Sequence, residues 1–200
     1  MRRRKIGLLG GSFNPAHDGH RDLSLAALAA LRLDEVWWLV APQNPLKPVA
    51  GMAPLPERLD QARTKAGHPR ILVTDLECRL GTRYTADTLA KLVERYRSCQ
   101  FVWLMGADNL GQIDRWKAWT QIFHLLPIAV FDRPTYTYGA LAAKAARRFA
   151  RQRKRESASH LLALASTPAW MFVHHRLNPI SATAIRAAAS KAQALASKRK

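Results

Sequence analysis

Short apolar runs recur along the chain and are separated by longer segments with helical periodicity. The runs cover residues 5–9, 36–41, 71–76, 101–105, 128–131 and 170–174. All but the first are apolar almost throughout, instead of alternating between apolar and polar residues. This pattern is typical of parallel strands that are covered on both faces. The sequence therefore predicts six buried strands.

Helical patterns lie between these runs, near residues 20–32, 56–66, 86–97, 112–125, 140–164 and 182–196. In the first of them, Leu23, Ala26, Ala27 and Ala30 fall at three- and four-residue spacing and form one apolar stripe. Strands that alternate with helices imply right-handed crossovers. We predict an α/β fold, a single-domain Rossmann-like doubly wound parallel sheet with helices on both faces. Ligands of such folds lie beyond the carboxyl ends of the strands.

The length and composition indicate one globular domain over residues 1–200. The chain has 200 residues and an apolar fraction of 48%, which is ordinary for a folded domain. No apolar run approaches the ~20 residues of a membrane helix, and the one at the start is too short for a signal peptide. Cys78 and Cys99 have neither metal-site nor CxxC spacing, which favours reduced thiols. We expect a cytoplasmic protein with no membrane partner.

The net charge of +18 comes from three segments, residues 2–5, 144–155 and 186–200, none of which contains an acid. Together they hold 16 of the 32 Lys and Arg residues, so the rest of the chain is nearly neutral. We expect the basic helical stretch 140–165 and the basic C-terminal tail 187–200 to be solvated or to contact anions non-specifically. No specific nucleic-acid partner is expected.

The exit of the first strand carries the strongest chemical signal. It runs from Gly10 and Gly11 to His17 and His20, with the sequence GGSFNPAHDGH, and leads into a helix. Glycines allow close approach of a bulky anion, and a helix N-terminus offers free N–H groups and a positive dipole end. Two histidines three residues apart can face one point. They could form half of a zinc site, but no third ligand is evident, so we expect no protein-bound metal.

This stretch is neither a GxGxxG nor a Walker motif, which argues against a dehydrogenase and a P-loop kinase. It resembles the (H/T)xGH signature of the nucleotidyltransferase superfamily, in the form found in bacterial nicotinate-nucleotide adenylyltransferases. ISATAIR, residues 180–186, is similar to the family's ISSTxIR. Between them, PQNPLK, YTADTL and GADNL followed by Trp116 resemble its PxxxPxHK, YTxDTL and GAD…W elements. The resemblance spans residues 6–186, although Leu46 and Ala182 replace a usual histidine and serine.

The resemblance implies transfer of AMP from ATP to nicotinate mononucleotide, which yields deamido-NAD and pyrophosphate. His17, His20, Lys47 and Arg186 would be catalytic, with Mg²⁺ carried mainly by the ATP phosphates. The residues expected to bind ATP are Gly10, Gly11, Ser12, Phe13, Gly106, Asp108, Ser181 and Thr183. Those expected to bind nicotinate mononucleotide are Asn44, Tyr84, Thr85 and Trp116.

Several alternatives stay open at this point. The acceptor could be nicotinamide mononucleotide or another phosphate ester. A protein of another class, a basic RNA-binding protein on a nucleotide-binding fold, is also conceivable, but it would not need the four catalytic residues. Asp108 and Thr85 could simply cap helices, and Trp116 could belong to the core. The sequence leaves the oligomeric state open.

Overall fold

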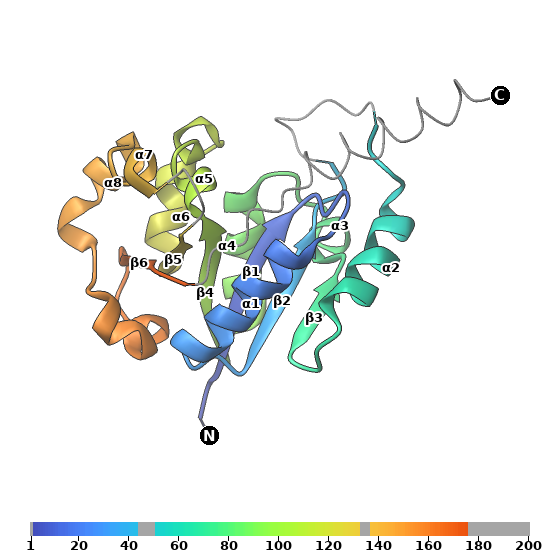
Figure 1. Cartoon of the computed structure of the whole chain (residues 1–200), viewed down its shortest axis with the longest axis horizontal. Helices are drawn as coiled ribbons and strands as arrows, with labels where there is room; N and C mark the ends of the chain where they lie inside the picture. The colour runs from blue at the N-terminus through green and yellow to red at the C-terminus, as the bar shows by residue number, and fades with distance from the viewer. Residues whose placement is uncertain (1, 44–50, 133–136, 176–200) are drawn as a thin grey trace, which may run out of the picture.

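The computed structural model describes residues 2–43, 51–132 and 137–175 (Figure 1). Its centre is a six-stranded sheet in the order β3-β2-β1-β4-β5-β6, with every neighbouring pair parallel. The strands are β1 (Arg4–Gly11), β2 (Glu35–Val40), β3 (Ile71–Thr74), β4 (Cys99–Gly106), β5 (Ile128–Phe131) and β6 (Trp170–Val173). All six predicted strands are confirmed, with small shifts at their ends. The strand order reverses between β1 and β4, and this reversal places the ligand cleft.

Helices cover both faces of the sheet. The longer α-helices are α1 (Asp18–Ala30), α2 (Leu55–Ala66), α4 (Thr85–Arg95) and α6 (Trp119–Leu125). Short α-helices and 3₁₀ helices complete the described chain: α3 (Leu76–Arg79), α5 (Ala107–Leu110), η1 (Ile113–Arg115), α7 (Thr137–Leu141), α8 (Lys144–Arg148), η2 (Ala150–Gln152) and η3 (Glu156–Leu164). Figure 1 shows α1 lying across β1 and β2, with α2 beside β3. No helix in the described part of the chain is long and apolar enough to cross a membrane.

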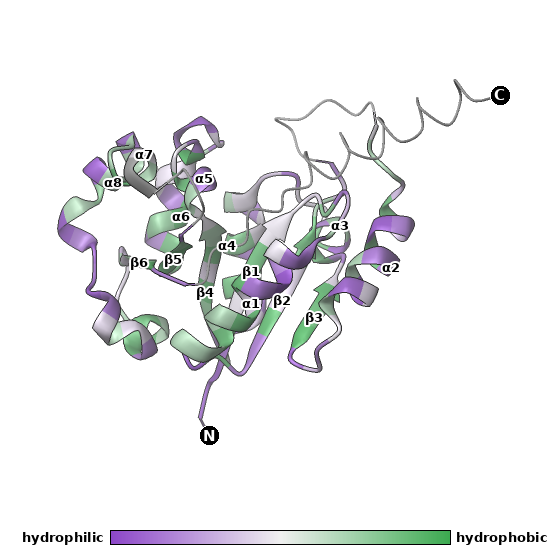
Figure 2. Ribbon diagram, viewed as in Figure 1, coloured by the Kyte–Doolittle hydropathy of each residue, from purple (hydrophilic) through white to green (hydrophobic). Residues whose placement is uncertain are grey.

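Two apolar cores, one on each face, hold the helices to the sheet. In β1, Ile6 and Leu8 join the core beneath α4 and α6, whereas Leu9 joins the core beneath α1 and α2. Adjacent strand residues point to opposite faces, so a strand buried on both sides must be apolar at every position. Figure 2 accordingly shows hydrophobic strands at the centre and hydrophilic stretches on the surrounding helices and loops. These two cores confirm the doubly wound prediction.

The single helix predicted over residues 140–164 is wrong. The chain there forms α7, α8, η2 and η3, interrupted where the backbone N–H of Lys154 donates to the carbonyl of Trp170 at 2.7 Å. Arg153 also bridges to Trp170 in β6. A run of basic residues without acids gives a helix only like-charge neighbours, so tertiary pairing with the sheet prevails.

The helix predicted over residues 112–125 is also split. Trp116 is extended and Ala118 is left-handed, with φ of 52°, between η1 and α6. Lys117, between them, places its Nζ over the ring of Tyr84, 4.3 Å from the ring centroid. The break therefore joins this segment to the start of α4. The helix predicted over residues 182–196 lies outside the described residues.

Candidate active site

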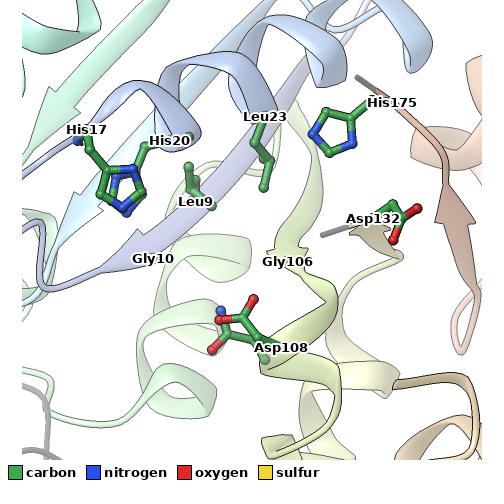
Figure 3. A pocket seen from close by; sticks show the side chains of 11 residues that line it. Leu9, Gly10, His17, His20, Leu23, Gly106, Asp108, Asp132 and His175 are labelled. Carbon is green, nitrogen blue, oxygen red and sulfur yellow. The ribbon is translucent and has the colours of Figure 1, made fainter. Parts of the chain in front are cut away.

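A cleft opens where the strand order reverses, at the carboxyl ends of β1 and β4 (Figure 3). Its walls come from the exits of four strands and from the first turns of α1. The lining residues are Leu9, Gly10, His17, Gly19, His20, Leu23, Gly106, Asp108, Asn109, Asp132 and His175. The predicted residues Gly10, His17, His20, Gly106 and Asp108 thus share one cleft, although they come from two distant parts of the chain.

The turn after β1 is shaped by close packing beneath it. A Cβ on Gly10 would lie 2.5 Å from the indole ring of Trp103, so only glycine fits there. Phe13 adopts a left-handed φ of 46° and turns its side chain into the core. Its ring centroid lies 4.6 Å from that of His20 and 4.9 Å from that of Trp38. Phe13 therefore supports His20 from below, and its side chain does not line the cleft.

His17 and His20 lie side by side at the start of α1, with ring centroids 3.9 Å apart. His17 is the N-cap residue, and its backbone N–H donates to Nδ1 of His20 at 3.3 Å. Because Nδ1 accepts this hydrogen bond, the neutral imidazole of His20 carries its hydrogen on Nε2. Nε2 is then a hydrogen-bond donor, fixed in position by the helix that it caps.

A buried chain of hydrogen bonds supports this helical turn. The hydroxyl of Ser24 donates to the backbone carbonyl of His20 at 2.8 Å, and the indole N–H of Trp38 donates to that hydroxyl at 2.8 Å. Trp38 belongs to β2 and is fully buried. The sheet itself thus holds the histidine pair, which limits the movement of both rings.

Asp108 lies across the cleft from the histidines, just after β4 (Figure 3). It sits in the first turn of the short helix α5, whose N-cap is Gly106, and that helix has no side-chain cap. The alternative that Asp108 caps this helix is therefore wrong. A carboxylate at this wall offers two acceptor oxygens to hydroxyl groups of a ligand.

Two further residues that line the cleft, Asp132 and His175, were not identified from the sequence. Asp132 follows β5 directly, and His175 follows β6; both lie at the end of the cleft away from His17 (Figure 3). Burial lowers the pKa of His175, although the nearby charges of Asp132 and Asp22 partly oppose this shift. The signal was available, because side chains that follow parallel strands meet at one edge of the sheet.

Three of the residues expected to bind the acceptor, Tyr84, Thr85 and Trp116, are described and lie outside the lining of this cleft. Tyr84 is the N-cap of α4 and Thr85 is its first residue, with no side-chain cap, so the alternative that Thr85 caps this helix is wrong. Lys117 links this turn to the neighbouring segment, through the Tyr84 ring and, at 4.0 Å, through Asp87. Trp116 is half-buried and packs against the core.

Comparison with known proteins agrees with this geometry. Residues 8–188 match the family described as cytidylyltransferase-like. A Methylorubrum extorquens protein named "Probable nicotinate-nucleotide adenylyltransferase" is 53% identical over 182 residues, or 91% of this chain and 98% of that protein. A Cereibacter sphaeroides protein of the same name is 52% identical over 91% of this chain and 96% of its own length. The chain belongs to the nicotinate-nucleotide adenylyltransferase family.

A solved structure supports the fold of this family member. Nicotinic acid mononucleotide adenylyltransferase of Plasmodium falciparum, complexed with NaAD, superposes with a TM-score of 0.67. The alignment covers 92% of this chain and 82% of that protein at 17% identity. At this identity the likeness concerns the fold alone.

The other residues that the family resemblance singled out are placed as follows. Gly11 is the last residue of β1, and its carbonyl accepts a hydrogen bond from the backbone N–H of Ala41 at 2.9 Å; Ser12 begins the turn that follows. Ser12 is half-buried, and its carbonyl accepts a hydrogen bond from Arg58. Five expected site residues lie outside the described residues: Asn44, Lys47, Ser181, Thr183 and Arg186.

Proposed function

We propose that the protein transfers AMP from ATP to nicotinate mononucleotide, with deamido-NAD and pyrophosphate as products. The observation that carries this proposal is the histidine pair at the N-terminus of α1, which faces Asp108 across the reversal of the strand order. The family membership agrees with it, since relatives 53% identical carry the name of this activity.

The reaction joins an oxygen of the acceptor phosphate to the α-phosphorus of ATP. The bond from this phosphorus to the oxygen bridging to the β-phosphate breaks, and pyrophosphate leaves with both electrons of that bond. The attacking phosphate is already anionic, so alignment and charge stabilisation matter more than a base. Nε2–H of His20 and the N-terminal amides of α1 are donors suited to the crowded phosphate oxygens. His17, beside His20, would share this task.

The remaining ATP contacts follow from residue chemistry and the family resemblance. Asp108 would accept hydrogen bonds from the ribose hydroxyls, and the glycines at 10, 11 and 106 would let the backbone approach the nucleotide. Lys47 and Arg186 would bind phosphate oxygens, with Ser12, Ser181 and Thr183 as hydroxyl donors. Among the described residues no three His, Cys, Asp or Glu side chains group as a metal site. By the family resemblance, Mg²⁺ would be carried mainly by the ATP phosphates, where it would neutralise charge.

The acceptor site would lie at the start of α4. This helix has 11 residues, and its first turn offers backbone N–H groups and a positive dipole end to the nicotinate carboxylate. Tyr84 and Thr85 stand at that turn, and the half-buried Trp116 would stack its ring on the pyridine. Asn44 would add a polar contact. We place the reaction in the cytoplasm, which is consistent with the free thiols of Cys78 and Cys99.

An assay of pyrophosphate release tests this function. The purified protein is incubated with ATP, Mg²⁺ and, in turn, nicotinate mononucleotide, nicotinamide mononucleotide and phosphopantetheine, and the product is identified by mass. We expect pyrophosphate and deamido-NAD with nicotinate mononucleotide. Labelled RNA is titrated in parallel, with a variant truncated after Leu195 as control. Tight, sequence-selective RNA binding, without turnover on any acceptor, would instead establish an RNA-binding protein.

A further inference from the structure

Arg58, in α2, is an arginine inside the core whose hydrogen bonds all run to backbone carbonyls. It is only 1% exposed. Its Nε donates to Ala53 at 2.9 Å, Nη1 donates to Ser12 and Ala41 at 2.7 Å each, and Nη2 donates to Pro42 at 2.8 Å. Four of the five N–H hydrogens of a guanidinium are thus used. None of these four partners is an acid.

The four carbonyls belong to three separate segments of backbone. Ser12 lies in the turn after β1, which leads to the histidine pair, and Ala41 and Pro42 follow β2 directly. Ala53 lies two residues before α2. Residues 44–50, which include Asn44 and Lys47, stand in the sequence between the last two segments. Arg58 therefore fixes both flanks of that stretch relative to the turn after β1.

Asn14 makes a second, independent connection between the same segments. Its Nδ2 donates to the carbonyl of Gly51 at 2.9 Å, and its Oδ1 accepts from the backbone N–H of Ala53 at 3.2 Å. The backbone pair of Ala41 and Gly11 adds a third contact. Together these contacts hold the backbone on either side of residues 44–50 against the turn after β1.

The chemistry of the side chain explains why an arginine is needed here. A buried charge is costly unless it is fully hydrogen-bonded, and a packed apolar residue would be cheaper. An apolar residue, however, would leave the four half-buried carbonyls without the donors that Arg58 supplies. A lysine carries its three ammonium hydrogens on one nitrogen atom. It therefore cannot reach all four carbonyls, which are arranged around the three nitrogens of the planar guanidinium. Only the guanidinium satisfies all four carbonyls at once and keeps three segments in register.

We infer that Arg58 is a positioning residue for adenylyl transfer. It holds the backbone at Ala41, Pro42 and Ala53 in place against the turn after β1, which leads to the histidine pair. The inference rests on the function proposed above, in which this histidine pair binds phosphate. A misplacement of about 1 Å in such a site lowers turnover by about 10²-fold, because reacting groups must meet in line.

The test compares Arg58→Lys and Arg58→Met with the matched variants Arg63→Lys and Arg63→Met. Arg63 lies on the outer side of the same helix, 59% exposed and paired with Asp60. For Arg58→Lys we expect kcat and kcat/KM for ATP to fall together by about 10–100-fold, measured well below the melting temperature of each variant. The Arg63 variants should stay within about twofold of wild type.

Hydrogen exchange provides the readout that a general loss of stability would not give. In Arg58→Lys, amide exchange should rise in peptides covering residues 10–16 and 41–54 and stay unchanged in β4 and β5. Unchanged kinetics, unchanged exchange in those two peptides, or an even rise over the whole sheet would each overturn the inference. If the Arg58 variants do not fold, Asn14→Ala supplies the same comparison, with a smaller effect in the same direction.

The two proposals can fail separately. If wild-type protein releases no pyrophosphate with nicotinate mononucleotide, the proposed function is wrong. The exchange comparison still shows whether Arg58 holds the three segments. If the wild type is active and Arg58→Lys exchanges like wild type, the positioning role is wrong while the function stands.

Discussion

His20 has two separable tasks in the structure, and substitution by Asn or Gln can divide them. Its Nδ1 accepts the N–H of His17 at 3.3 Å, which leaves the ring hydrogen on Nε2 as a donor, and His20 lines the cleft. The amide oxygen of Asn reaches the position of Nδ1 but no atom of Asn reaches that of Nε2. Gln reaches the position of Nε2 with an NH₂ donor but loses the acceptor for His17. The two variants should therefore fail in opposite ways.

The expected magnitudes follow from these contacts. When an enzyme loses one hydrogen-bond donor that is placed where negative charge develops in the transition state, kcat falls by about 10²–10³-fold, or roughly 2.7–4 kcal/mol. Loss of a long cap hydrogen bond lowers the free energy of unfolding by about 0.5–1 kcal/mol. His20→Asn should thus be stable and nearly inactive, while His20→Gln should be less stable and keep much of its turnover. Both lose the ring contact with Phe13, so this effect cancels in the comparison.

Pyrophosphate release gives kcat, and urea unfolding followed by tryptophan fluorescence gives the free energy of unfolding. Alanine at either His17 or His20 serves as the reference, with an expected loss of about 10²–10⁴-fold in turnover and nearly intact folding. The reasoning fails if His20→Asn keeps more than about a third of wild-type kcat, or if His20→Gln is as inactive as His20→Asn.

Two other substitutions test the buried carboxyl group and the acceptor site. Burial raises the pKa of Glu77 from 4.5 to about 7, so the folded state binds its proton more tightly than the unfolded chain. Wild type should therefore lose about 3 kcal/mol of stability as the pH rises from about 4.5 through 7, and Glu77→Gln should remove this loss. Urea unfolding at about pH 5 and pH 8 checks it, and equal pH dependence of both proteins would contradict it. Trp116→Ala should mainly raise KM for nicotinate mononucleotide and leave KM for ATP almost unchanged; steady-state kinetics with each substrate varied decide it, and a larger change in KM for ATP would refute the stacking role.

The strands could be predicted from sequence because burial on both faces leaves a continuous apolar signature. The breaks in the helices could not, since they depend on contacts with distant residues. Lys154 leaves a helical pattern to pair with Trp170, and Lys117 leaves one to reach Tyr84. Such contacts cannot be predicted from the sequence before the order of the strands in the sheet is known.

The same division applies to the site. His17 and His20 could be found because they share one local turn, and the family resemblance joined Asp108 to them. Asp132 and His175 were missed because only the sheet order brings the ends of β5 and β6 to the cleft. Arg58 was missed for a different reason. An arginine on a polar helix is expected to be exposed to solvent. The burial of Arg58 depends on three separate backbone segments whose carbonyls accept its hydrogen bonds.

The central claim concerns the acceptor, and competition between the two mononucleotides tests it most directly. Nicotinate carries a carboxylate where nicotinamide carries a neutral amide, whose NH₂ would face the N–H donors at the start of α4. With both present in one reaction, deamido-NAD and NAD are quantified by mass spectrometry to give the ratio of kcat/KM values. We predict a preference for nicotinate mononucleotide of at least ~10²-fold, worth roughly 2.7 kcal/mol. Equal use of the two, or a preference for the amide, would contradict the acceptor site assigned to Tyr84, Thr85 and Trp116.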